Sequence, residues 1–334
     1  MKLLVIGCAI FILVISCCGV YFLSKSNSEK SLLSPGGLNS TPQPTPKPLL
    51  TYTFTNLAKR KYQASQIKLG ETVTENSAYI SQLFTYQSDS YTISGIANFP
   101  VTPESKKRPV IIMIRGYVDQ EMYRPGIGTE KAAAIFAQNG YITLAPDFLD
   151  YGSSDKGKDD VWFNRFHNPV DVLNLIASVG SIGMADPTKI GIWAHSNGGQ
   201  IALSVLEISG KNYPTTLWAP VSKPFPYSVL YYTDEFDDEG KYLRQELAYF
   251  EQDYDVTDFS ITQYFDQIQA PLQIHQGDKD EEVPVYWSNT LVDQLKGLDK
   301  DVTYFVWVGA DHNMVGSWGE VVEKDVEFFD KHLQ

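Results

Sequence analysis

Residues 189–203 contain the feature that most restricts what this chain can fold into. An apolar segment runs into Ser196 and is followed at once by small residues and the start of an apolar helix. Ala194, Gly198 and Gly199 allow a sharp turn and let a helix lie close to a sheet. This small-x-Ser-x-Gly pattern is typical of a nucleophile elbow, which holds a serine hydroxyl above a sheet edge. Because Ser-Asn-Gly also occurs in ordinary turns, the identification of a site depends on residues elsewhere in the chain.

Strand-like and helix-like segments alternate through most of the chain. Strand patterns cover residues 78–85, 91–100, 108–114, 141–146, 189–195, 215–219, 271–275 and 302–308. Helical apolar spacing covers residues 129–139, 159–182, 285–298 and 321–333. Such alternation predicts an α/β fold, with a mostly parallel central sheet covered by helices on both faces. Catalytic groups on such a sheet belong at the carboxyl ends of its strands.

The segment from about residue 221 to 269 interrupts this alternation. It is rich in aromatic residues and carries a run of acidic side chains at 234–239. A long insertion between two strands whose ends face the site is more often a cap than a linker. We therefore expect a cap insertion here, and we interpret the acidic run as a solvated loop rather than a cation site.

Composition excludes several classes of protein. The formal net charge is −13, and a nucleic-acid-binding protein needs basic patches that this chain lacks. All three cysteines, Cys8, Cys17 and Cys18, lie in the first 18 residues, so the folded part can have no disulfide, thiolate metal site or cysteine nucleophile. The five histidines show no metal-ligand spacing. We expect no metal, no cofactor and no nucleic-acid partner.

Residues 1–23 read as a targeting segment. Residues 3–23 form an almost uninterrupted apolar run between two lysines, long enough to span a bilayer. The segment also resembles an export signal with a lipoprotein box, in which Cys17 would be lipidated. Both the transmembrane and the lipoprotein interpretation place the protein at a membrane, with its domain on the extracytoplasmic side of a bacterial cell envelope.

Residues 24–50 are rich in serine, proline and threonine, and prolines occupy every second position near the end of this stretch. Such a sequence favours an extended and stiff spacer. We therefore expect three regions: an anchor at 1–23, a linker at 24–50 and one α/β domain at 51–334.

A serine nucleophile needs a base, which in turn needs an orienting carboxylate. In this fold class the chain order is serine, then acid, then histidine. His312 follows the last predicted strand, in Gly-Ala-Asp-His, and is the expected base. The alternatives fit poorly: His332 is at the tail, His167 is in a helix, His195 points away from its serine neighbour, and His275 lies before the acid loop and reads as structural.

The acid is expected after the preceding strand. Residues 275–284 offer four carboxylates there: Asp278, Asp280, Glu281 and Glu282. Asp280 lies three residues before a Val-Pro pair whose proline marks the start of the next helix. The other three are solvated turn residues by default, and spacing leaves the choice open.

Several ordered motifs together resemble an α/β-hydrolase of the prolyl oligopeptidase type, close to its dienelactone-hydrolase-like and acyl-peptidase relatives. The matching segments are 194–199, 275–284, 309–312, 146–155 and 186–191. The resemblance covers roughly residues 75–334. It implies an α/β-hydrolase fold, and its His-Gly-x-x-Asp-x-x-Val-Pro pattern selects Asp280 as the acid beside Ser196 and His312.

The resemblance also implies an oxyanion hole formed by the backbone N–H groups of Tyr117 and Asn197. The family usually has a histidine before the glycine of this loop, whereas this chain has Arg115. Two interpretations of Arg115 stay open: a structural residue paired at the surface, or a ligand for a substrate carboxylate.

The function implied is that of a serine hydrolase that cleaves peptide or amide bonds through an acyl-enzyme on Ser196. A carboxylesterase acting on small acyl or aryl esters is the alternative. A catalytically dead binding module is the hypothesis from another class, and it predicts the loss of a triad member, whereas all three are present. Peptidase relatives carry a β-propeller, and the roughly 25 residues before the first predicted strand cannot form one. We therefore expect selectivity to come from the cap.

Overall fold

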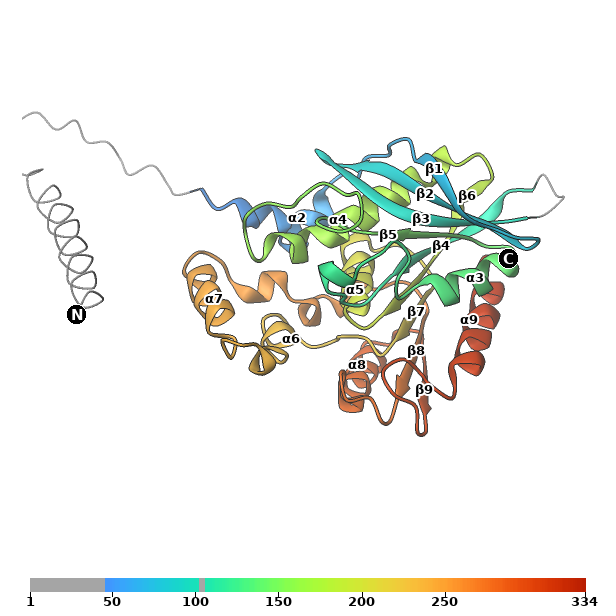
Figure 1. The fold of residues 1–334 in the computed structure, drawn as a ribbon. Helices are drawn as coiled ribbons and strands as arrows, with labels where there is room; N and C mark the ends of the chain where they lie inside the picture. The colour runs from blue at the N-terminus through green and yellow to red at the C-terminus, as the bar shows by residue number, and fades with distance from the viewer. Residues whose placement is uncertain (1–45, 102–105) are drawn as a thin grey trace, which may run out of the picture. The chain divides into compact units, whose positions relative to one another are not determined.

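A nine-stranded open sheet forms the centre of the computed structural model, which describes residues 46–101 and 106–334 (Figure 1). The strand order is β1-β2-β3-β5-β4-β6-β7-β8-β9. The strands are β1 (Lys68–Glu75), β2 (Tyr79–Ser88), β3 (Tyr91–Pro100), β4 (Arg108–Ile114), β5 (Ile142–Pro146), β6 (Ala185–His195), β7 (Thr215–Trp218), β8 (Leu272–Gly277) and β9 (Val302–Trp307).

The sheet is antiparallel at one side and parallel at the other. Strands β1, β2 and β3 pair antiparallel, and β3 pairs antiparallel with β5. From β5 to β9 every neighbouring pair is parallel. The predicted fold class, a mostly parallel sheet with helices on both faces, is thereby confirmed.

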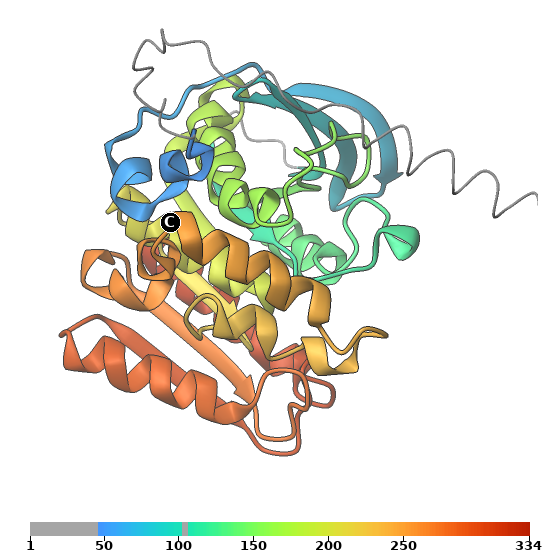
Figure 2. The same cartoon turned by 90° about the vertical axis from the view of Figure 1, so that its left-hand side faces the viewer.

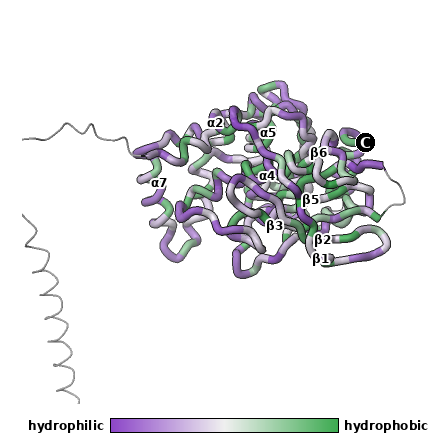
Figure 3. Tube along the Cα trace, turned by 90° about the horizontal axis from the view of Figure 1, so that it is seen from above, coloured by the Kyte–Doolittle hydropathy of each residue, from purple (hydrophilic) through white to green (hydrophobic). Residues whose placement is uncertain are grey.

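The described helices are α2 (Phe54–Lys59), α3 (Glu130–Gln138), α4 (Phe163–Ser178), α5 (Asn197–Ser209), α6 (Tyr227–Leu230), α7 (Lys241–Asp253), α8 (Val285–Gly297) and α9 (Trp318–Leu333). Helices α4, α5 and α8 contribute to one large apolar cluster, and α3 and α9 to a second cluster. Figure 3 shows the hydrophobic residues concentrated in the strands, whereas α7 carries hydrophilic residues.

Strand β4 shows why the middle of the sheet is buried on both faces. Successive side chains of a strand point to opposite faces. Accordingly, Val110, Ile112 and Ile114 belong to the first cluster, and Ile111 and Met113 to the second. All five are fully buried. The continuous apolar run predicted from sequence is therefore the consequence of helices packing on both sides of one strand.

The boundaries of most predicted elements agree with the structure to within three residues. The helix predicted over 159–182 is four residues shorter at each end, as α4 (Phe163–Ser178), and β6 begins four residues before the predicted 189. Strand β1 was not predicted. All eight of its residues are exposed, so the strand has neither an apolar run nor an apolar face for a sequence pattern to reveal. It is held by backbone pairing with β2.

The insertion between β7 and β8 is a folded helical layer. It contains α6, α7 and four short 3-10 turns, and in Figure 2 α7 lies nearer to the viewer than the strands. Phe225, Phe250 and Phe259 of the insertion pack with Phe166 of α4, with ring centroids 4.6–5.8 Å apart. The acidic run is largely solvent-exposed, as expected.

The predicted anchor at 1–23, with Cys17, lies outside the described residues, as does most of the predicted linker. Among the helices of the described segments, none combines the length and the apolar character needed to cross a bilayer. The domain begins slightly before the expected residue 51: Pro48–Tyr52 forms a 3-10 turn, and Leu49 is buried.

Candidate active site

Ser196 occupies a strained turn between β6 and α5. Its backbone has φ 56° and ψ −122°, a region that a residue with a side chain visits only when the surroundings enforce it. Ser196 N donates to Trp218 O at 2.9 Å, and Ser196 O accepts from Val221 N at 3.0 Å. The side chain makes no capping bond to α5. The elbow predicted from sequence is therefore present, with its hydroxyl uncommitted to the helix.

The two glycines after Ser196 are required by close backbone contacts. A Cβ atom at Gly198 would lie 2.3 Å from Ile114 O, and one at Gly199 would lie 2.5 Å from Pro220 Cβ. Both separations are far below van der Waals contact. The small residues of the motif thus allow α5 to start directly against the end of β4.

His312 and Asp280 form a pair beyond the ends of β9 and β8, in which Asp280 is buried and His312 is partly exposed. His312 Nδ1 lies 2.9 Å from Asp280 Oδ2, and the Asp280 side chain has no exposed surface. Because an ionised carboxylate only accepts hydrogen bonds, Nδ1 carries the proton and Nε2 is left as a base. The structure thus brings together the two residues that the sequence assigned as base and acid.

Asp280 is fixed by further donors. The backbone N–H groups of Glu282 and Val283 donate to Oδ1 at 3.0 and 2.8 Å. Gln276 Nε2 donates to Oδ2 at 2.8 Å, and Ser288 Oγ donates to Gln276 Oε1 at 2.7 Å. Sequence reasoning missed Gln276, a buried amide one position before the end of β8.

The competing carboxylates lie elsewhere. Asp278 Oδ1 accepts from Gly309 N at 2.7 Å and caps a turn, while Glu281 and Glu282 are exposed. In the described residues, Asp280 is the carboxylate that pairs with His312.

His195 links the serine elbow to the His312 loop, a role that sequence reasoning missed. His195 Nε2 donates to the backbone oxygen of His312 at 3.0 Å, and the two rings pack with centroids 4.6 Å apart. Burial, followed by the proximity of His312, lowers the pKa of His195 to about 4. His195 is therefore neutral near pH 7 and positions its neighbour rather than acting as a second base. The one sequence feature that could have indicated this role is the position of His195 directly before Ser196.

In the described part of the chain, no hydrogen bond joins Ser196 Oγ to His312. Such a contact is often long until substrate binds. The His195 bridge and the burial of Asp280 keep the His312 ring next to the elbow.

The predicted oxyanion-hole loop lies against the serine. A Cβ atom at Gly116 would lie 3.0 Å from Ser196 Cβ, so the loop after β4 passes next to the nucleophile. Within residues 46–101 and 106–334, neither Tyr117 N–H nor Asn197 N–H donates to a protein atom. The Tyr117 side chain is 72 % exposed, and its hydroxyl donates to Asp119 Oδ1 at 2.7 Å.

Arg115 is not the surface-paired residue of the first sequence-based interpretation, because only 7 % of its area is exposed. Its guanidinium donates to two backbone carbonyls and stacks between two tyrosine rings. Its Nε atom has no hydrogen-bond partner in the described residues and is buried.

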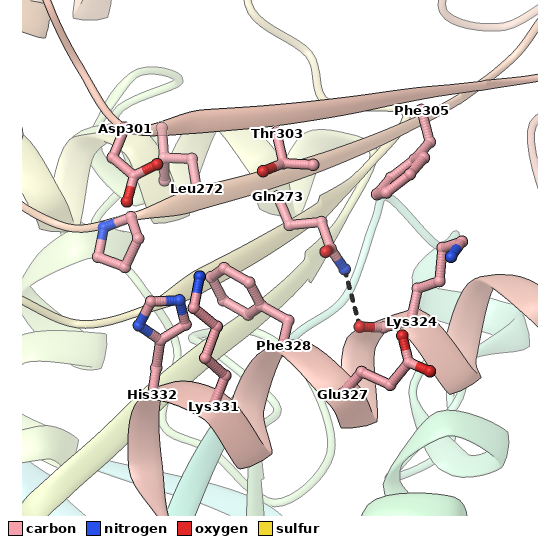
Figure 4. Close-up of a pocket in the computed structure, with 11 residues that line it drawn as sticks. Leu272, Gln273, Asp301, Thr303, Phe305, Lys324, Glu327, Phe328, Lys331 and His332 are labelled. Atoms are coloured by element: carbon pink, nitrogen blue, oxygen red, sulfur yellow. Dashed lines mark hydrogen bonds between the residues drawn. The ribbon is translucent and has the colours of Figure 1, made fainter.

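A cavity of about 200 Å³ between β8, β9 and α9 lies apart from this site (Figure 4). Its charged lining mixes Lys324 and Lys331 with Asp301 and Glu327, so it favours neither sign of ligand charge. In the described segments, no cluster of three or more potential ligand side chains could hold a metal ion.

A search of protein families matches residues 128–334 to the prolyl oligopeptidase family. The match covers more than half of the chain and includes Ser196, Asp280 and His312. The protein therefore belongs to the prolyl oligopeptidase family. A search of curated protein sequences found no match.

Solved structures with the same fold include peptidases and esterases. Porphyromonas gingivalis dipeptidyl peptidase 4 has 16 % identity and a TM-score of 0.52, with 82 % of this chain and 36 % of that chain covered. Pyrococcus horikoshii acylaminoacyl peptidase has 19 % identity and a TM-score of 0.58, with 80 % and 48 % covered. The acetyl xylan esterase from Paenibacillus sp. R4 has 15 % identity and a TM-score of 0.60, with 82 % and 91 % covered.

At these identities the likeness shows the fold alone. The chain spans less than half the length of those two peptidases but most of the length of the esterase. Because both activities occur on the same fold, the substrate class must be argued from the site.

Proposed function

We propose that this protein hydrolyses peptide or amide bonds through an acyl-enzyme on Ser196. The observation that carries the proposal is the juxtaposition of a strained serine elbow with the His312–Asp280 pair. Family membership favours a peptide substrate.

In the proposed reaction, Ser196 Oγ attacks the substrate carbonyl while His312 Nε2 takes its proton. Asp280 holds His312 in the required tautomer and stabilises the imidazolium that forms. The N–H groups of Tyr117 and Asn197 donate to the oxyanion. His312 then returns the proton to the leaving group, and water hydrolyses the acyl-enzyme by the same route.

A carboxylesterase is the second candidate, and a specific observation favours it. The chain covers 91 % of the acetyl xylan esterase from Paenibacillus sp. R4 and 98 % of Est1E from Butyrivibrio proteoclasticus, whose structure has ferulic acid bound. A chain of this length is comparable to single-domain esterases. Ester hydrolysis also demands less of the proton donor, because an alkoxide or phenoxide can leave unprotonated, whereas an amide nitrogen must be protonated before it leaves.

The helical insertion is the proposed source of selectivity. Tyr227, Tyr231 and Tyr232 surround Trp287, with ring centroids 4.9–6.2 Å from it. Trp287 lies in the first turn of α8, soon after Asp280, and Tyr227 and Tyr231 are more than a third exposed. This aromatic surface beside the acid loop suits an apolar or aromatic substrate group.

The experiment compares matched p-nitrophenyl esters with aminoacyl and dipeptidyl p-nitroanilides, using the full chain in detergent. Anilide turnover that disappears in Ser196→Ala supports a peptidase, whereas ester turnover alone supports an esterase. Absence of both activities, together with failure of a fluorophosphonate to label Ser196, would overturn the proposal in favour of a binding module.

We further infer that residues 1–23 attach the protein to the outer face of a bacterial cytoplasmic membrane. Support comes from the apolar run at 3–23 and from the lipoprotein-like sequence before Cys17. Labelled palmitate that enters wild type and not Cys17→Ser would favour lipidation. Unlabelled protein that stays with membranes after a carbonate wash would favour a transmembrane anchor, and protein recovered in the soluble fraction would refute attachment.

A further inference from the structure

Arg115 contacts the peptide group that carries one of the proposed oxyanion donors. Arg115 Nη1 donates to Gly116 O at 2.9 Å. Gly116 C=O and Tyr117 N–H belong to the same planar peptide unit, so a bond at the oxygen fixes the direction of the N–H. Arg115 Nη2 donates to Asp147 O at 3.1 Å, which ties the end of β4 to the end of β5.

The guanidinium is itself held in place. Its Cζ atom lies 4.1 Å from the ring centroid of Tyr151 and 4.7 Å from that of Tyr123. The Tyr123 hydroxyl donates to the buried carboxylate of Asp147. Tyr151 has a second contact with the same loop, because its hydroxyl donates to Val118 O at 2.9 Å. Carbonyl groups on both sides of Tyr117 are therefore fixed.

We propose that Arg115 is a positioning residue for catalysis: it orients and polarises the Gly116–Tyr117 peptide so that Tyr117 N–H is aimed at the oxyanion. This inference rests on the proposed function. A cation at the carbonyl oxygen draws electron density away from the N–H and makes it a stronger donor, and burial strengthens that effect. The benefit is largest where negative charge develops, in the transition state.

The tests are Arg115→Gln and Arg115→Lys in the full chain. Glutamine removes the charge, whereas lysine keeps it but cannot span both carbonyls in the planar geometry of a guanidinium. Loss of a whole oxyanion donor costs about 10²–10³ in kcat. For a misdirected donor we expect kcat to fall about 10- to 100-fold in the glutamine variant and less in the lysine variant, with KM changed less than about threefold.

Rates are normalised to active sites titrated to completion with a fluorophosphonate, so that misfolded protein does not count. The matched control is Arg124→Gln, an exposed arginine of the same loop that pairs with Glu130 and is expected to leave kcat unchanged. The rate of fluorophosphonate labelling should fall in parallel with kcat in the Arg115 variants.

Three results would overturn the inference. Unchanged kcat per titrated site with a lower melting temperature would make Arg115 merely structural. A raised KM confined to substrates with a carboxylate would make it a substrate ligand. An equal fall in kcat in Arg124→Gln would show a general effect of the loop. Failure of the proposed function is distinguishable, because Ser196 would then not be labelled in wild type either.

Discussion

The substitution Asp280→Asn tests the proposed triad most directly. Asp280 Oδ1 accepts two backbone N–H groups, and Oδ2 accepts from Gln276 Nε2 and His312 Nδ1. An asparagine has one oxygen and one NH2 group. Its oxygen is expected to take the two backbone donors, so that the NH2 group faces His312. A neutral His312 must then accept at Nδ1 and carry its proton on Nε2, where it cannot act as a base.

The size of the effect follows from this wrong tautomer. In a serine protease triad the same substitution lowers kcat about 10⁴-fold, which corresponds to about 5.5 kcal/mol of transition-state stabilisation. We expect a fall of about 10³- to 10⁴-fold here, because the two backbone donors at Oδ1 fix the orientation of the replacement. Stability should change less, since the side chain keeps its shape and half of its contacts.

The assay measures kcat for the best p-nitrophenyl ester or p-nitroanilide, with thermal unfolding in parallel. The matched control is Asp278→Asn, which alters a carboxylate of the same loop that accepts from Gly309 N. A loss of less than about tenfold for Asp280→Asn, or an equal loss for Asp278→Asn, would refute the assignment of Asp280 as the orienting acid.

Three further predictions concern Gly198 of the serine elbow, His195, which contacts His312, and the buried carboxyl group of Glu207. Gly198→Ala should prevent folding or lower the melting temperature by more than about 5 °C, because its Cβ would clash with a main-chain oxygen of β4. The control Gly183→Ala, whose Cβ would lie in open space, should leave the melting temperature nearly unchanged. His195→Phe keeps the ring contact and loses the bond to His312 O, so kcat should fall about tenfold while the acid limb of the pH profile stays in place. Glu207 is 3 % exposed, and burial raises its pKa well above the usual range. Above about pH 4.3 the folded state therefore binds more protons than the unfolded state. The free energy of unfolding consequently falls as pH rises. Glu207→Gln should therefore stabilise the protein more at pH 8 than at pH 5 in thermal melts, and an equal difference at both values would refute the argument.

Much of the fold could be predicted because its signals are local. The run 110–114 is apolar at every position since helices cover both faces of β4, and α3 and α9 show helical apolar spacing because each buries a single side. The elbow could also be recognised in the sequence. A Cβ atom at position 198 would clash with a main-chain oxygen of β4, so the position requires glycine. Strand β1 escaped prediction since its exposed residues make no apolar pattern.

The sequence predicted the proposed catalytic residues but not the residues that hold them in place. Ser196 and His312 stood out by their place after strands, whereas Asp280 needed a family pattern to be chosen among four carboxylates. Gln276, which fixes Asp280, gave no signal of its own, and His195, which contacts His312, was marked only by its position directly before Ser196. The identity of a hydrogen-bond partner depends on which segments meet in space, and a one-dimensional pattern carries no such information.

The order of most elements, the mostly parallel sheet and the serine elbow could all be predicted from the sequence, because burial on one or both faces leaves a periodic pattern in the chain. The tertiary structure alone decided what each polar group contacts. Arg115 is the clearest case: its sequence position suggested a surface or substrate role, and the folded chain buries it between two tyrosines with its donors on backbone carbonyls. The two carbonyl partners, of Gly116 and Asp147, lie in the segments after β4 and after β5. Only the pairing of the two strands brings these segments together.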